Sequence, residues 1–397
     1  MSSHSPAVRE LMSTDEPHQP GRGEDTSPVS LAVRSLSARS WTGVRAPAGS
    51  LAPVSERMTA WYLDASPGTY QWGEVAVPDL GPDDVRIRVK ASALNRMDLW
   101  LTKGLPKPKA LPHVPGGDVV GVVDAVGAAT TGWSPGDEVV VNPTITSAET
   151  ASSGYDSVLD RSMAILGEQR WGGHGTFVVV PARNLVARPA GRTWAEAAAY
   201  PTAHVTAWRM LRRARMSSGD VVLVVGVGSG VSAAALGLAT HLGAEVHVTS
   251  RDPAKLERAV EMGAVGTHDS SQPFDVQADI VIESVGPATW NHSLKALKPG
   301  GRMAVCGGTS GSSVELSLPK LFWKQHELIG SSMGSYVEFD EVTELVTAGA
   351  PVTVDDVVPL ERYPEALDRL EGGEQLGKIV LAHGDPDEIR GEPGSDA

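Results

Sequence analysis

The stretch Val221-Val-Leu-Val-Val-Gly-Val-Gly-Ser-Gly-Val-Ser-Ala-Ala-Ala235 decides the fold class of this chain. Its apolar, β-branched start predicts a buried strand, and its alanine-rich end predicts a helix. The glycines between them predict a tight turn, where free N–H groups and the positive end of a helix attract phosphate. We expect a dinucleotide's phosphates to lie on the four residues Gly228, Ser229, Gly230 and Val231.

Outward from this turn, short apolar strands alternate with helical stretches. Strands are predicted at 245–249, 280–283 and 302–306, and helices at 231–242, 253–262 and 290–297. Such alternation is typical of a parallel sheet with helices on both faces. Residues 58–181 differ, because short apolar segments there are separated by Gly, Pro and Asp turns, as in a compact β domain. The expected fold class is therefore α/β, a β-rich domain followed by a doubly wound parallel sheet.

The same patterns give the expected domain boundaries. Residues 1–57 are rich in Ser, Pro, Gly and charged residues and are expected to be a disordered extension. The β domain is expected over 58–184 and the nucleotide-binding domain over 185–335. Two helices and a last strand over 336–385 could return to either domain, and 386–397 is expected to be a flexible tail.

Composition excludes several classes of function. A formal charge of −14 disfavours nucleic acids and anionic membrane surfaces, and no apolar run is long enough to span a membrane. The single cysteine, Cys306, excludes an intramolecular disulfide and a multi-cysteine metal cage. We expect a cytoplasmic protein that acts on a small molecule.

The end of the second strand predicts which dinucleotide binds. NAD-specific sites place an acid here for the ribose hydroxyls, whereas this chain has Ser250 and Arg251, which suit a 2′-phosphate. NADPH is therefore expected, and Lys255 is added to the site. In the alternative interpretation Arg251 is a solvated loop residue and Asp252 binds the ribose.

Several motifs together resemble the medium-chain dehydrogenase/reductase superfamily, in particular its zinc-lacking, quinone-oxidoreductase-like branch. The resemblance spans about Met58 to His383. It implies a GroES-like β domain, a Rossmann domain, and a C-terminal return to the first domain, with the active site in the cleft between them. It also implies a homodimer that continues the Rossmann sheets edge to edge, through 302–306 and 314–318. The motifs are Ala93-Leu-Asn-Arg-Met-Asp-Leu-Trp100, Pro135-Gly-Asp-Glu-Val139, Gly173-His-Gly-Thr-Phe-Val-Val-Val-Pro181, Leu297-Lys-Pro-Gly-Gly301 and Gly377-Lys-Ile-Val380.

The resemblance breaks at both zinc sites of the family. The positions of the catalytic zinc ligands correspond to Asn95, Gly117 and Thr202, which are poor ligands. The lobe that holds structural zinc corresponds to 142–166 and contains no cysteine. We expect no zinc; a rebuilt site would need the histidines 113 and 174 with the acids 98 or 118.

Without a metal, hydrogen bonds must stabilise the negative charge that develops on the substrate, which suits quinones and α,β-unsaturated carbonyls. Asn95 is the candidate donor to the carbonyl, Asp98 orients its loop, and Lys103 is a further donor. Each has a structural alternative: a turn, a helix cap and a solvated charge. Trp100 stands where the branch often has a tyrosine, which leaves the proton source open.

Family matching adds further cofactor contacts, many of which could equally be turn residues. They are Thr206, Ser284, Val285, Gly286, Gly307, Gly308, Ser332, Met333, Gly334 and Lys378. The expected activity is an NADPH-dependent quinone or enone reductase. Two alternatives remain: a zinc-dependent alcohol dehydrogenase with rebuilt ligands, and a non-catalytic NADPH-binding protein.

Overall fold

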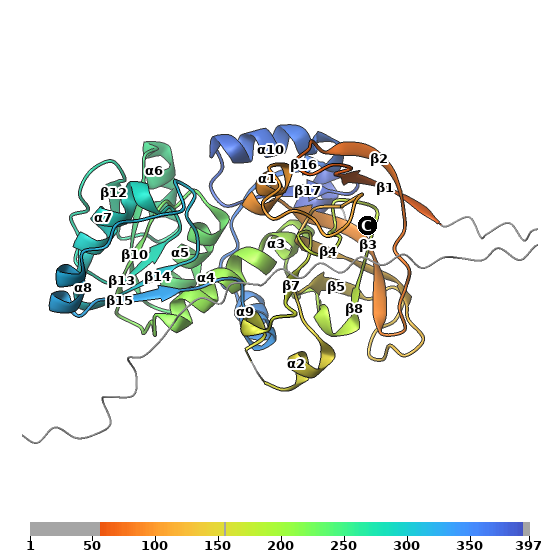
Figure 1. The fold of residues 1–397 in the computed structure, drawn as a ribbon, viewed down its shortest axis with the longest axis horizontal. Helices are drawn as coiled ribbons and strands as arrows, with labels where there is room; N and C mark the ends of the chain where they lie inside the picture. The colour runs from red at the N-terminus through yellow and green to blue at the C-terminus, as the bar shows by residue number, and fades with distance from the viewer. Residues whose placement is uncertain (1–55, 155, 392–397) are drawn as a thin grey trace, which may run out of the picture. The chain divides into compact units, whose positions relative to one another are not determined.

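The structure is a computed structural model that describes residues 56–154 and 156–391. The expected disordered extension lies outside these residues, apart from Glu56 and Arg57. Arg57 already begins strand β1 (Arg57–Tyr62), which pairs with β2 (Gln71–Ala76). Strand β1 therefore begins one residue before the predicted start of the β domain at 58 (Figure 1).

The phosphate-turn sequence forms the centre of a six-stranded sheet. The strand order is β12, β11, β10, β13, β14, β15, and all neighbouring pairs are parallel. The strands are β10 (Val221–Val224), β11 (Glu245–Ser250), β12 (Gly266–Asp269), β13 (Ala278–Glu283), β14 (Leu297–Val305) and β15 (Glu327–Gly330). The helices between and beside them are α4 (Pro201–Arg213), α5 (Gly230–His241), α6 (Pro253–Glu261), α7 (Pro287–Ala296), α8 (Leu318–Lys324) and α9 (Tyr336–Thr347). The predicted α/β fold class is confirmed.

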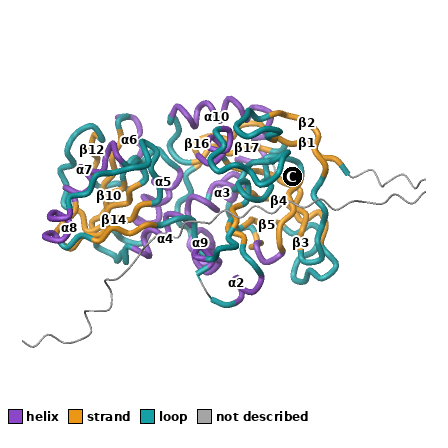
Figure 2. The backbone as a smooth tube through the Cα atoms, viewed as in Figure 1, coloured by secondary structure: helices purple, strands orange, loops and turns teal. Residues whose placement is uncertain are grey.

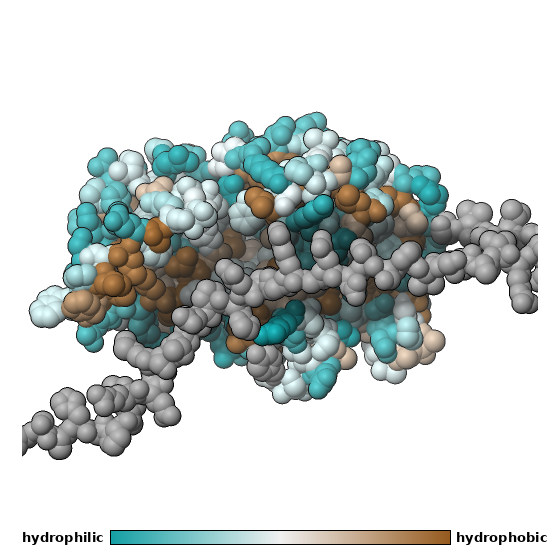
Figure 3. Space-filling view, in the orientation of Figure 1, coloured by the Kyte–Doolittle hydropathy of each residue, from teal (hydrophilic) through white to brown (hydrophobic). Residues whose placement is uncertain are grey.

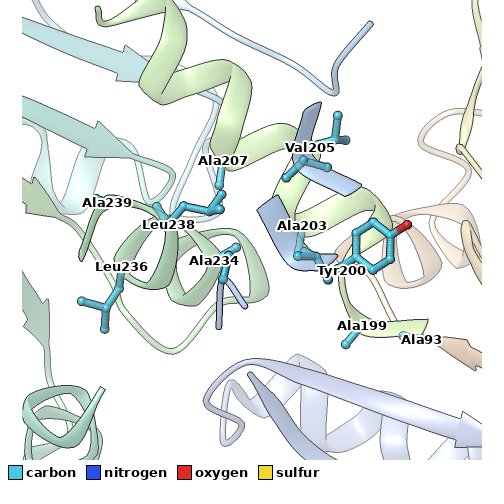
Figure 4. Packing of buried hydrophobic residues seen from close by; sticks show 14 of the residues in the cluster. Ala93, Ala199, Tyr200, Ala203, Val205, Ala207, Ala234, Leu236, Leu238 and Ala239 are labelled. Carbon is cyan, nitrogen blue, oxygen red and sulfur yellow. The ribbon is translucent and has the colours of Figure 1, made fainter. Parts of the chain in front are cut away.

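Small side chains let α4 and α5 pack closely. Ala203 and Ala207 on α4 and Ala234 and Leu238 on α5 are buried, and Figure 4 shows them between the two helices. Because α5 is apolar on nearly all sides, it is covered on one face by the sheet and on another by α4. This packing fixes the start of α5, which carries the phosphate turn.

The first domain is a seven-stranded sheet that includes the C-terminal strands. Its order is β16, β17, β3, β4, β5, β9, with β8 also paired to β3. Figure 1 shows β17, at the blue end of the chain, beside β3 near the orange end. The strands are β3 (Asp84–Ala93), β4 (Asp118–Val126), β5 (Glu138–Val141), β8 (Phe177–Pro181), β9 (Leu185–Ala187), β16 (Val354–Pro359) and β17 (Lys378–Ala382).

Short helices and a small ribbon complete this domain, and Figure 2 shows helices and strands in separate colours. The ribbon is β6 (Thr144–Ile145) with β7 (Ala164–Ile165). The helices are α1 (Arg96–Thr102), α2 (Ala148–Ser152), α3 (Trp194–Ala199), α10 (Tyr363–Gly372) and α11 (Pro386–Arg390). Single turns of 3₁₀ helix occur at η2 (Ser157–Leu159), η3 (Ala182–Asn184) and η4 (Leu360–Arg362).

Two predicted domain boundaries and the predicted dimer contact through 302–306 need correction. Strand β9 pairs with β5 and α3 packs on β3, so the first domain extends past residue 184. The tail predicted from 386 was wrong up to 391, because α11 is capped by Asp385 and buries Ile389. Residues 302–306 are not at the sheet edge, because β14 is paired on both sides and β15 is the outermost strand.

Candidate functional site

The phosphate turn has the geometry that its sequence predicts. Gly226 has φ +73°, a left-handed conformation that favours glycine, and Ser229 caps α5 by accepting the N–H of Ser232 at 3.1 Å. The first N–H groups of α5, at Gly230 and Val231, have no carbonyl one turn earlier to bind. These donors are available for an anion at the positive end of the helix.

Ser232 replaces the glycine that usually ends this motif. Its hydroxyl is fully buried, donates to the Val225 carbonyl at 3.2 Å, and receives a hydrogen bond from Ser229 at 2.9 Å. A small side chain that satisfies its own polar atom therefore fits between strand and helix.

A cavity of about 540 Å³ runs from this turn across the carboxyl ends of β11 and β13. Such edges of parallel sheets are where α/β proteins bind nucleotides. The predicted cofactor residues that line it are Gly228, Ser229, Ser250, Arg251, Lys255, Ser284 and Val285.

One end of this cavity suits a phosphate next to a ribose. Ser250 and Lys255 are nearly buried, and Arg251 is exposed with no ion pair among the described residues. The Lys255 ammonium donates to the Gly373 carbonyl, and its burial lowers its pKa. Asp252, the alternative ribose ligand, instead caps α6 by accepting the Ala254 N–H at 3.0 Å and does not line the cavity. The residues present fit a dinucleotide with a 2′-phosphate better than one without.

A buried carboxylate shapes the loop after β13. Glu283 Oε1 accepts the N–H groups of Val285 at 2.7 Å and of Gly286 at 3.0 Å. The carboxylate also accepts hydroxyl hydrogen bonds from Thr289 and Ser293. These bonds satisfy a fully buried charge and hold Val285 at the cavity wall.

A second cavity of about 150 Å³ adjoins the first. Its lining combines residues of both domains. The candidate donor Asn95 lines it, as do Trp100 and Lys378. The predicted cofactor residues Gly230, Val231 and Gly307 line it as well. The nicotinamide half of a dinucleotide and its substrate would therefore meet beside Asn95.

Lys378 joins the two sides of this second cavity. Its ammonium lies 2.6 Å from Asp118 Oδ2 and 2.7 Å from Asn95 Oδ1, and it also donates to the Leu94 carbonyl. Family matching predicted Lys378 as a cofactor contact; in the structure its charge is bound to Asp118. Its side-chain stem still borders the phosphate turn, because a Cβ at Gly230 would lie 2.7 Å from Lys378 Cδ.

The other two catalytic candidates lie differently. Asp98 is buried outside both cavities, and its Oδ2 accepts the Asn95 N–H at 2.7 Å. This is the capping-box bond of α1, so the bond matches the helix-cap alternative and also holds the loop at Asn95. Lys103 lines neither cavity and pairs with Glu371 at the surface, with N–O 2.9 Å. Lys103 is therefore not placed to donate to a substrate in either cavity.

Six predicted cofactor contacts line neither cavity: Thr206, Gly286, Gly308, Ser332, Met333 and Gly334. Gly286, with φ +91°, forms the turn held by Glu283. Gly334 lies against α4, since a Cβ there would meet Val205 at 2.2 Å. The contact of these six residues with a cofactor stays a prediction.

Sequence reasoning missed several lining residues. Ser270 and Ser271 line the first cavity, and Arg96 and Gln375 line both cavities. The two serines follow β12, whose short polar sequence did not predict a strand. The sequence gives no signal for them, because only the pairing of β12 with β11 brings these serines next to the end of β11.

The three positions of the family's catalytic zinc ligands do come together. A Cβ at Gly117 would lie 3.8 Å from Asn95 Nδ2 and 3.8 Å from Thr202 Oγ1. None of the three offers the thiolate, imidazole or carboxylate that zinc prefers. Among the described residues, no group of three His, Cys, Asp or Glu side chains could hold a metal ion. The donor set does not fit zinc.

The histidines proposed for a rebuilt zinc site are bound elsewhere. His113 Nε2 bonds to the Gly167 carbonyl at 3.0 Å, and burial lowers its pKa. His174 Nδ1 bonds to Ser92 at 2.9 Å, and its Nε2 lies 3.8 Å from Asp98 Oδ1. Their positions are explained by buried hydrogen bonds.

An ion-pair cluster holds the lobe that in the family contains structural zinc. Arg209 on α4 is nearly buried and lies 2.5 Å from Asp156 of the lobe and 2.6 Å from Glu338 on α9. The backbone N–H of Tyr336 donates to the Ser157 hydroxyl at 3.3 Å. We call Arg209, Asp156 and Glu338 the lobe clamp, which ties the lobe to two helices without a metal.

Comparisons with known proteins agree with this geometry. Two family models match: the alcohol dehydrogenase GroES-like domain over residues 81–190 and the zinc-binding dehydrogenase over residues 230–348. A zinc-type alcohol dehydrogenase-like protein of Schizosaccharomyces pombe is 32% identical over 78% of this chain and 93% of its own length. A 2-methylene-furan-3-one reductase of Solanum lycopersicum is 30% identical over 77% of this chain and 74% of its own length.

Solved structures are similar in fold. An NAD-dependent alcohol dehydrogenase has a TM-score of 0.77 and 37% identity and covers 82% of this chain and all of its own. A 2-octenoyl-CoA carboxylase reductase, solved with NADP and 2-octenoyl-CoA, has a TM-score of 0.76 and 27% identity and covers 86% of this chain and 90% of its own. The first and second cavities therefore lie in a fold whose solved relatives include dinucleotide-dependent enzymes.

Proposed function

Because the chain belongs to the medium-chain dehydrogenase/reductase superfamily, we propose that it is an NADPH-dependent oxidoreductase that reduces quinones or α,β-unsaturated carbonyls without catalytic zinc. The observation that carries this proposal is the convergence of Asn95, Gly117 and Thr202, of which Asn95 lines the second cavity. This arrangement offers an amide donor to a carbonyl oxygen and lacks ligands for a metal.

The first cavity supports the choice of NADPH. Ser250, Arg251 and Lys255 would hold the 2′-phosphate, with hydroxyls of Ser270 and Ser271 nearby. Phosphate binds guanidinium groups by charge-assisted hydrogen bonds. The start of α5 would hold the pyrophosphate.

When bound, NADPH supplies a hydride from its nicotinamide ring. Asn95 would donate a hydrogen bond to the substrate carbonyl, and Asp98 keeps that loop in place through the Asn95 N–H. The apolar side chains of Leu94, Trp100 and Ile379 line the same cavity and limit access of water to the reacting atoms.

The acceptor class follows from the donor type. A hydrogen bond in a preorganised site contributes roughly 10² to 10³ in rate, which is enough for conjugated acceptors that take hydride at carbon. Simple ketones gain more from a Lewis acid. The tomato 2-methylene-furan-3-one reductase and the 2-octenoyl-CoA carboxylase reductase support a conjugated acceptor for this chain.

The test is NADPH oxidation by chelator-treated protein with a panel of quinones and enones, with NADH run alongside. We expect turnover that survives the chelator and prefers NADPH. Turnover that appears only after zinc is added would favour the rebuilt alcohol dehydrogenase. NADPH binding without turnover on any acceptor would favour a non-catalytic binding protein.

We also propose a homodimer. Leu318, Phe322 and Trp323 of α8 are exposed, and α8 buries none of its residues. It precedes β15, the open edge of the sheet, and Figure 3 shows apolar side chains over this part of the surface. A partner sheet added to β15 would cover both features.

The cytoplasm is the compartment we propose. Among the described residues, no helix is long and apolar enough to cross a membrane. The thiol of Cys306 is half-buried, and burial raises its pKa to about 12, so it has little thiolate character.

A further inference from the structure

The two charged groups that contact the Asn95 carboxamide, Asp118 and Lys378, form an ion pair with each other. Asp118 is completely buried, and its Oδ1 accepts the Thr202 N–H at 2.7 Å. Its Oδ2 accepts Asn95 Nδ2 at 2.9 Å and Lys378 Nζ at 2.6 Å. An ammonium has three N–H donors, and those of Lys378 go to Asp118, Asn95 and Leu94. The cation is therefore held in one position.

This network fixes the orientation of the Asn95 carboxamide. Its oxygen faces the Lys378 ammonium and one N–H faces the Asp118 carboxylate. The flipped amide would place its NH₂ group against a cation and its oxygen against an anion. The second N–H of Nδ2 has no partner among the described residues, and Asn95 lines the second cavity.

Within this network the Lys378 ammonium strengthens that free donor, whereas the Asp118 carboxylate holds the amide in place. A cation on an amide oxygen withdraws electron density from the nitrogen, and hydrogen bonds in a chain polarise one another most where water is excluded. We infer that Asp118 holds and Lys378 holds and polarises the Asn95 carboxamide, which binds the carbonyl oxygen of the substrate. Lys378 is then a positioning residue, since it acts through Asn95.

This inference rests on the proposed reductase activity. In the reaction, the β-carbon of the enone would gain the hydride that NADPH supplies, the C=C electron pair would become a double bond between the α-carbon and the carbonyl carbon, and the C=O π pair would move to the oxygen. That oxygen becomes an enolate oxygen, and Asn95 Nδ2 donates to it. A proton from water then adds at the α-carbon, which restores the C=O bond. The Asn95 N–H, whose own carbonyl oxygen accepts from the Lys378 ammonium, faces the one atom on which negative charge appears.

The experiment compares Asn95→Ala, Lys378→Met and the double variant with the wild type, using an enone at saturating NADPH. We expect each single variant to lower kcat about 10²- to 10³-fold. Because Lys378 acts through Asn95, the double variant should be no slower than Asn95→Ala. Lys378→Arg, which keeps the charge, should recover part of the rate. The Kd for NADPH without substrate should change less than twofold.

Removing Lys378 alone leaves a buried carboxylate without its cation, which can prevent folding. Lys378→Met with Asp118→Asn removes both charges and serves as the second variant, with circular dichroism to check folding. Lys90→Met, on β3 and paired with Glu388 at the surface, is the matched control.

Three outcomes would overturn the inference. If the two single effects multiply in the double variant, Lys378 works independently of Asn95. If Lys378→Met weakens NADPH binding and leaves kcat unchanged, it serves the cofactor. If both single variants keep wild-type kcat, Asn95 does not bind the carbonyl. A wild type that turns over no enone or quinone rejects the proposed function itself, and the inference with it.

Discussion

Arg251 is the sharpest test of cofactor choice. It lines the first cavity and has no ion pair among the described residues, so Arg251→Ala removes a charge without leaving a buried partner. A hydrogen bond to a charged group contributes about 1.5 to 3 kcal/mol, and an exposed one lies at the lower end. We expect the Kd for NADPH to rise about tenfold, which corresponds to about 1.4 kcal/mol.

The assay is cofactor titration followed by nicotinamide fluorescence, with NADPH and NADH, at low and high salt. NADH has no 2′-phosphate, so its Kd should change less than twofold. High salt should weaken NADPH binding more in the wild type than in the variant, because screening removes part of the same interaction. Arg258→Ala is the control, since Arg258 lies on α6, pairs with Asp355 and lines neither cavity. Equal weakening of both cofactors, or tighter NADH binding by the wild type, would refute the assignment.

Three further predictions concern stability and assembly. Arg209→Ala breaks the lobe clamp and should lower the free energy of unfolding, measured in urea, by about 2 to 4 kcal/mol. Arg213→Ala, at an exposed position of the same helix, should lower it by less than about 1 kcal/mol. Equal losses for the two variants would contradict a stabilising role of the clamp. Burial lowers the pKa of His204 to about 4, so below about pH 6.5 the unfolded state binds more protons and stability falls by up to about 3 kcal/mol towards pH 4. His204→Gln should flatten this decline, and an unchanged pH profile would count against it. Trp323→Glu should convert a dimer to a monomer in light scattering, and a monomeric wild type would reject the proposed interface.

The sequence predicted most of the fold because its signals are local. The apolar run of β10 and the helical stretches of α5 and α6 lie within single segments, and the structure has them at those places. Periodicity cannot reveal β12, which is short and polar, or α8, whose apolar side chains are exposed. These elements depend on neighbouring strands or on a partner.

The candidate site was predictable only in its cofactor half. The phosphate turn is continuous in sequence. The network of Asn95, Asp118 and Lys378, in contrast, joins residues on or next to three separate strands. Asn95 was found through its family position, but its orientation depends on Asp118 and Lys378, and only the folded structure brings these together. Lys103 follows the cavity residue Trp100 by three positions, but its charge pairs with Glu371 of α10, a contact that only the folded structure reveals.

The order of synthesis gives the position of Lys378 a further consequence. Asn95 and Lys378 are 283 residues apart, and the strand that carries Lys378 is the last strand of the described chain. During translation the phosphate turn leaves the ribosome well before β17, and domains fold as they emerge. Until β17 pairs with it, part of β3 has a free edge and Asp118 lacks its cation. A nascent chain could therefore hold a dinucleotide while its reducing centre is still incomplete.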